Sequence, residues 1–137
     1  MTTTLLLSLL FTWSNLQEEE KITINVTNIK TNTGFIMIAI YDDEENFLTR
    51  RVVTSGKFKV SAKGNLKCDL AIPFGDYAIS IFHDKDSDGR LGSNLFKIPN
   101  EPIGFSNNAS AFFGPPDFEK AVFSFRTPAQ EHTIKLK

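Results

Sequence analysis

The chain has 137 residues, of which 41% are hydrophobic and 12% aromatic, and it carries 15 Lys and Arg against 16 Asp and Glu. This length suits one domain with its own core, and the composition is typical of a globular chain, not a disordered one. The net charge of -1 gives no electrostatic reason to expect a nucleic-acid partner.

Residues 1–16 differ in character from the rest of the chain. Seven large apolar side chains lie close together there: Leu5, Leu6, Leu7, Leu9, Leu10, Phe11 and Trp13. The run is too short to span a bilayer but has the length of a signal-peptide core, although no Lys or Arg precedes it. We therefore predict a signal peptide at 1–16 and a domain at 17–137, with a buried N-terminal helix as the alternative. An exported protein would be periplasmic, displayed on the cell surface or secreted, and no other segment is apolar and long enough to cross a membrane.

From residue 22 onward, apolar and polar residues alternate with a period of two, which predicts short β-strands separated by turns. The predicted strands are 22–27, 35–41, 47–53, 58–62, 66–72, 77–82, 121–125 and 133–136. About seven such strands at this spacing indicate an all-β sandwich, immunoglobulin-like or transthyretin-like in topology. The stretch 83–118 lacks alternation and is rich in Gly, Pro, Asn and Asp, so we expect one long ordered loop there, and any functional site within it.

The single cysteine, Cys68, excludes an intrachain disulfide and a zinc site built on several thiolates. Cys68 stands in an alternating run with Leu66 and Leu70, which favours a small buried apolar side chain over a reactive thiol.

An acidic loop follows the predicted strand 77–82. Asp84, Asp86 and Asp88 occupy alternate positions, with Gly89 next, which is the spacing that lets carboxylates converge on a calcium ion. The backbone carbonyl of Arg90 would supply a further ligand. The position that should carry a bidentate Glu is Leu95, so a complete site needs another ligand, such as Asn94 or Glu101.

The alternative for this loop is a tight turn without an ion, in which the Asp side chains accept hydrogen bonds from nearby backbone N–H groups. Repulsion among three neighbouring carboxylates favours a cation or a neighbouring Lys or Arg. Both interpretations stay open at the level of the sequence.

A second candidate site lies around His83, Phe105, Asn107 and Asn108. Aromatic rings beside polar amides suit a carbohydrate or peptide ligand. The alternative is structural: His83 has no paired histidine and is typical of a hydrogen-bonded structural residue. The rings of Phe105, Phe112, Phe113 and Phe118 would then simply anchor the loop.

Four segments resemble the DUF2141 family of exported bacterial β-sandwich proteins, whose function is unknown. The segments are Phe74-Gly75-Asp76-Tyr77-Ala78, the stretch from His83-Asp84 through Asp88-Gly89, Glu101-Pro102-Ile103-Gly104-Phe105-Ser106-Asn107-Asn108, and Phe113-Gly114-Pro115-Pro116-Asp117-Phe118. The resemblance runs from about residue 22 to residue 137. It implies a β-sandwich, a bacterial origin and export, but no activity.

Three functions compete on this evidence. The first is a non-catalytic binding or structural module of the cell envelope, with an envelope protein or a carbohydrate as partner and calcium as a possible cofactor. The second is a glycan hydrolase that uses carboxylates such as Asp84, Glu101 or Asp117. The third is an assembly domain that pairs through a sheet edge. Since no nucleophile elbow, zinc helix or phosphate loop is present, we expect a protein that is not an enzyme.

Overall fold

The computed structural model describes residues 17–89, 101–111 and 113–137. Eight strands, one short α-helix and one 3-10 turn are found in these ranges. The elements, in chain order, are β1 (Glu20–Ile29), β2 (Phe35–Tyr41), β3 (Thr54–Lys59), β4 (Gly64–Ile72), β5 (Gly75–Asp84), β6 (Ile103–Phe105), η1 (Ser106–Asn108), α1 (Phe118–Ala121), β7 (Phe123–Phe125) and β8 (Glu131–Lys135).

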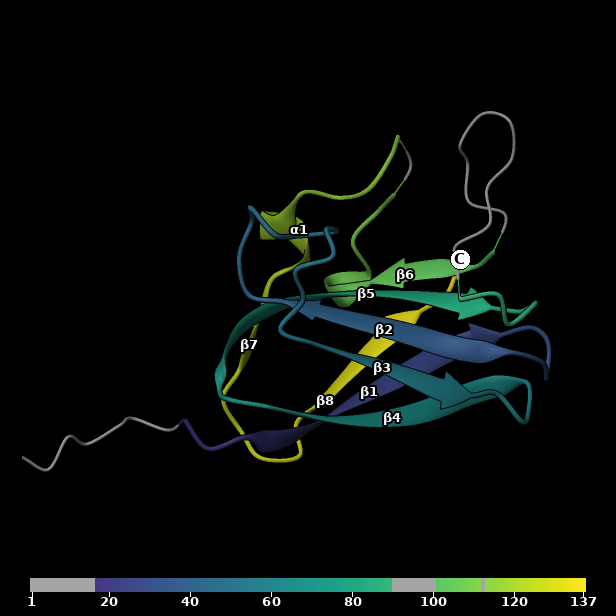
Figure 1. Cartoon of the computed structure of the whole chain (residues 1–137), viewed down its shortest axis with the longest axis horizontal. Helices are drawn as coiled ribbons and strands as arrows, with labels where there is room; N and C mark the ends of the chain where they lie inside the picture. The colour runs from purple at the N-terminus through teal and green to yellow at the C-terminus, as the bar shows by residue number, and fades with distance from the viewer. Residues whose placement is uncertain (1–16, 90–100, 112) are drawn as a thin grey trace, which may run out of the picture.

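The strands form two layers (Figure 1). One sheet has the order β4-β1-β8, in which β1 and β4 are antiparallel and β1 and β8 are parallel. The other has the order β3-β2-β5-β6, all antiparallel, and β7 pairs with the first residues of β5. The all-β sandwich predicted from the alternation is therefore confirmed.

The core lies between the two sheets because one set of alternating side chains on each central strand faces inward. On β1 these are Ile22, Ile24 and Val26, and the paired strands β2 and β5 contribute further isoleucines, including Ile38 and Ile79. Burial of each such side chain contributes about 1.5–3 kcal/mol. Among the described residues, no helix is long and apolar enough to cross a membrane.

The strand predicted at 47–53 is wrong. Residues 42–50 form turns and bends, in which the Asp43 carboxylate accepts a hydrogen bond from the Asn46 N–H at 2.7 Å, and no strand begins before Thr54. Leu48 has a φ of 62°, which a regular strand does not allow. The ring of Phe47 packs edge-on against Tyr41 at 5.4 Å and against Phe118 at 5.7 Å. These contacts hold the segment as a loop.

Strand β3 also lies earlier than the predicted 58–62, because Ser55 and Gly56, which fall between two predicted strands, belong to it. A Cβ at position 56 would lie 2.5 Å from the ring of Phe58, so glycine here makes room for that ring. The predicted strand 121–125 divides into the end of α1 and β7. Within the stretch 83–118, β6 and η1 are regular elements that alternation did not predict.

Two sets of backbone hydrogen bonds position the start of β6. The Pro102 carbonyl accepts the His83 N–H at 2.9 Å, which fixes the chain before β6 against the end of β5. Ile103 and Lys137 exchange N–H to carbonyl hydrogen bonds at 3.2 and 2.9 Å, which join β6 to the tail that follows β8. As a result, Glu101 lies beside the carboxyl end of β5.

Cys68 on β4 is fully buried in the core, as the alternation predicted. Burial, with a smaller contribution from the charge of Asp69, raises the pKa of the Cys68 thiol to about 12. The reactive thiolate is therefore scarce at neutral pH.

We expect Cys68 in the folded chain to resist a disulfide reagent such as Ellman's reagent at pH 8, where an exposed thiol reacts readily. The reagent should label one thiol per chain after unfolding in guanidinium. Rapid labelling of the folded chain would show that the β4 side of the core is open.

Candidate metal site

The acidic loop begins inside β5 itself. Asp84 is the last residue of that strand, and its side chain lies on the face opposite the core, because His83 takes the inward position. Asp84 is nevertheless 0% exposed. A buried carboxylate needs hydrogen-bond donors, and the loop that follows supplies them.

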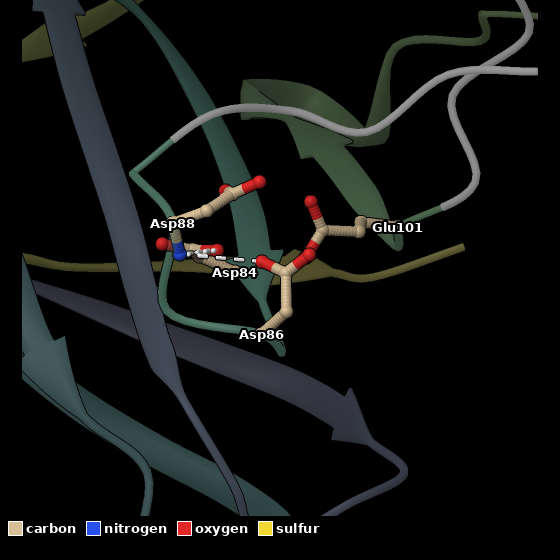
Figure 2. Close-up of side chains that lie close together, drawn as sticks. All are labelled: Asp84, Asp86, Asp88 and Glu101. Atoms are coloured by element: carbon tan, nitrogen blue, oxygen red, sulfur yellow. Dashed lines mark hydrogen bonds between the residues drawn. The ribbon is translucent and has the colours of Figure 1, made fainter.

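Backbone N–H groups of the loop donate hydrogen bonds to Asp84, and Figure 2 shows the one from Asp88. The Gly89 N–H donates to one carboxylate oxygen at 2.8 Å, and the Asp88 N–H donates to the other at 3.2 Å and to Asp86 at 3.3 Å. Ser87 and Gly89 have positive φ angles of 59° and 75°, which produce this tight curve. These hydrogen bonds make the loop a tight Asp-rich turn, which is compatible with both interpretations of the acidic loop.

Glu101 joins the loop from the other side of the site. Its carboxylate accepts the Lys85 N–H at 2.7 Å, and the side chain is only 7% exposed. Oxygens from Asp84, Asp86, Asp88 and Glu101 all lie within 4.8 Å of one another, so this cluster can hold a metal ion. Figure 2 shows the four carboxylates directed toward a common region. Glu101 is one of the two residues, with Asn94, that we expected from the sequence to complete the site.

The surroundings shift the pKa values of Asp84 and Asp86 in opposite directions. Burial acts to raise the pKa of Asp84, but hydrogen bonds with Gly89, Asp86 and Asp88 outweigh it and lower that pKa below its ordinary value. For Asp86, the hydrogen bond from the Asp88 N–H acts to lower the pKa. Desolvation, the contact with Asp84 and the charges of Asp88 and Glu101 outweigh that bond and raise the pKa. The surroundings therefore favour the charged form of Asp84 and disfavour that of Asp86.

Other predicted ligands are not placed. Arg90, whose backbone carbonyl was expected to complete the calcium loop, lies outside the described residues, as do Asn94, Leu95 and Phe112. Asp117 is exposed immediately before α1 and is not a member of the acidic cluster.

His83 is fully buried on the core side of β5. Its Nε2 lies 2.6 Å from the carbonyl oxygen of Thr33, while its Nδ1 has no hydrogen-bond partner among the described residues. This position favours the structural interpretation of His83.

The three residues of η1, Ser106, Asn107 and Asn108, form hydrogen bonds to distant parts of the chain, and we call them the Ser-Asn-Asn hub. The buried Ser106 hydroxyl accepts the Ile79 N–H at 2.8 Å and donates to the Ala121 carbonyl. The Asn107 amide donates to the carbonyls of Lys120 and Val122 at 3.2 and 2.8 Å. This hub therefore ties η1 to β5 and to the end of α1.

Asn108 and His132 extend these contacts to β8. The Asn108 side-chain oxygen accepts the Lys135 N–H at 2.9 Å, and Nε2 of His132 accepts the Asn107 N–H at 3.1 Å. Ligand binding by Asn107 and Asn108 remains a prediction, in competition with these internal bonds. The sequence did not reveal the hub, because its partners are distant backbone groups with no distinctive side chain.

The aromatic residues of the region divide into anchors and an exposed ring. Phe105 is 7% exposed, and Phe118 packs against Phe47, as the anchoring interpretation predicts. Phe113 is instead 96% exposed. The three described rings, those of Phe105, Phe113 and Phe118, therefore differ in their exposure.

A family model described as "Uncharacterized protein conserved in bacteria (DUF2141)" matches residues 24–133. The chain belongs to the DUF2141 family. The matched stretch runs from β1 into β8, and it includes the four residues of the acidic cluster and the Ser-Asn-Asn hub. Comparison with curated proteins and with solved structures found no match. The DUF2141 assignment confirms the family resemblance seen in the sequence, and it carries no ligand, activity or location.

Proposed function

We propose that this chain is a non-catalytic binding module of the bacterial cell envelope, in which calcium orders the acidic loop. The observation that carries the proposal is the convergence of Asp84, Asp86, Asp88 and Glu101, whose ligand oxygens lie within 4.8 Å of one another. These residues come from two separate parts of the chain. A bound cation would therefore stabilise a tertiary contact and not only a local turn.

The chemistry of the acidic cluster suits calcium. Calcium takes six to eight oxygen ligands and tolerates irregular geometry, whereas magnesium demands a near-ideal octahedron and retains its waters. Carboxylates supply only oxygen, and this cluster contains no histidine or cysteine, which zinc would favour. The negative charges of Asp88 and Glu101 are among the causes that raise the pKa of Asp86, and a divalent ion would offset their repulsion.

The burial and the positions of the carboxylates support a non-catalytic role. The hydrolase alternative requires two acids that can reach a sugar from opposite sides. Asp84 is fully buried and holds two backbone N–H groups, and Asp117 lies apart from the acidic cluster. Export is supported by the apolar run at 5–13, and the bacterial family is consistent with a bacterial cell envelope.

Calcium is expected to raise the thermal unfolding temperature of the full chain relative to the same protein in chelator. A ligand at one hundred times its dissociation constant stabilises the folded state by about 2.7 kcal/mol, which corresponds to a rise in the unfolding temperature of about 10 °C for a domain of this size. The measurement is differential scanning calorimetry across a calcium titration, with magnesium in parallel. An unfolding temperature that does not change up to millimolar calcium would contradict the proposal.

The variant Asp86→Asn, compared with and without calcium, distinguishes the stability gained from calcium binding from the stability gained by removing a repelling charge. Without calcium, this variant should be as stable as the parent chain or slightly more stable, because one repelling charge is lost. With calcium it should lose most of the shift. The matched control is Glu119→Gln, which removes one exposed carboxylate near α1 and should leave the calcium shift unchanged. Equal calcium shifts in both variants would exclude the acidic cluster as the site.

A further inference from the structure

The near-neutral net charge conceals a separation of charge along the chain. From residue 46 to residue 68 the sequence has six cationic side chains and no Asp or Glu. Lys67 forms an ion pair with Glu131 at 3.4 Å. The other five are exposed and form no ion pair within the described part of the chain. We call them the cationic edge: Arg50, Arg51, Lys57, Lys59 and Lys63.

The cationic edge follows the border of a sheet. β3 is the terminal strand of the order β3-β2-β5-β6, with Arg50 and Arg51 in the loop before it and Lys63 in the turn after it (Figure 1). The five cations therefore follow one another along β3 and its two flanking segments. Residues two apart in a strand lie about 7 Å apart, which is the separation expected between the Cα atoms of Lys57 and Lys59.

The border of β3 also offers hydrogen-bonding groups. No strand among the described residues pairs with the outer side of β3, so peptide N–H and carbonyl groups along that side are available to a ligand. Ser55 and Ser61 add exposed hydroxyl groups beside the lysines. Lys57 also lies 4.2 Å above the ring of Phe35 on β2, so an apolar surface borders the line of charge. A line of cations with hydrogen-bonding groups suits a polymer that carries both anionic and hydroxyl groups.

We propose that the cationic edge along β3 binds a linear acidic polysaccharide. The inference rests on the proposed binding role of the module but not on calcium. Acidic side chains at residues 42–45 precede the edge, and the acidic cluster ends β5, two strands away from β3. These carboxylates disfavour a dense polyanion such as duplex DNA, which carries a charge every 1.7 Å or so. A polysaccharide with one carboxylate per sugar is less densely charged and brings hydroxyl groups for the strand border.

Single-stranded nucleic acid is a weaker fit to the cationic edge. Its binding surfaces combine cations with exposed aromatic rings on which bases stack. On β3 the only ring is that of Phe58, which packs against the core, and the neighbouring Phe35 already carries Lys57. The edge therefore lacks a free stacking platform.

The test measures binding of the full chain to polygalacturonate at low salt, in the presence of a chelator, with neutral dextran as the reference polymer. We expect binding to polygalacturonate but not to dextran, and an affinity that falls as salt rises. Lys57→Gln/Lys59→Gln should weaken binding about tenfold, since each exposed ion pair contributes up to a fivefold factor. The control Lys120→Gln/Lys137→Gln removes the same charge elsewhere and should bind within about twofold of the parent chain.

Several results would overturn the inference. They are absence of binding to polygalacturonate at low salt, equal losses in the two double variants, and tighter binding to single-stranded DNA or to phosphatidylglycerol vesicles at equal anionic charge. Absence of binding would mean that the lysines serve only to keep the edge of β3 from pairing with other chains. Because a chelator is present throughout, binding here with no calcium shift in calorimetry would refute the calcium proposal alone.

Discussion

Gly34→Ala is expected to destabilise the domain by about 3 kcal/mol or more, a large part of the stability of a typical domain. Gly34 precedes β2 with a φ of +73°, and a Cβ there would lie 1.9 Å from the carbonyl oxygen of Asp84. It would also lie 2.8 Å from the Cα of Lys85. Both neighbours are backbone atoms, so relief requires the turn to move away from the start of the acidic loop. Chemical denaturation followed by circular dichroism measures the loss.

The matched control is Gly64→Ala. Gly64 also has a positive φ, +106°, but a Cβ there meets nothing within 4 Å. That variant should lose only the cost of the backbone conformation, about 1–2 kcal/mol. If the two variants are equally stable, the close approach of Gly34 to Asp84 does not exist in solution.

Ser106→Ala is the second substitution with a large expected effect, about 2–5 kcal/mol. Removing the hydroxyl leaves the Ile79 N–H and the Ala121 carbonyl without their partner, and each buried unsatisfied group costs about 1–3 kcal/mol. Urea unfolding of the variant measures the loss as a lower midpoint.

Ser110→Ala is the control for this prediction, because Ser110 is exposed and should tolerate the change within about 0.5 kcal/mol. A small loss in Ser106→Ala would imply that water replaces the hydroxyl, and the hub formed by Ser106 and Asn107 would then contribute little to the fold.

The central strands could be predicted from the sequence because their alternation is enforced by burial on one face. Residues 35–41 are predicted and observed as the same strand, and 77–82 lies within β5. Residues 47–53 have a strand-like composition, but the contacts of Phe47 with Tyr41 and Phe118 hold them in a loop. The contact with Phe118 joins residues far apart in the chain and leaves no local pattern.

In the candidate site, too, neighbouring residues could be predicted from their spacing, whereas residues brought in by tertiary structure could not. The alternate spacing of Asp84, Asp86 and Asp88 predicted their convergence, because a tight turn brings such neighbours together. The place of Glu101 depends on the pairing of β6 with β5, and β6 has only three residues. Its spacing from the acidic loop therefore gave no basis for choosing it over Asn94. The hub at Ser106 has the same origin, since its partners are backbone groups of β5 and α1.

A crystal structure of the full chain grown with calcium tests the central claim most directly. We predict one ion coordinated by oxygens of Asp84, Asp86, Asp88 and Glu101 at about 2.3–2.6 Å, with water or backbone carbonyls completing the shell. Calcium bound elsewhere, or four carboxylates that turn away from one another at saturating calcium, would contradict the account.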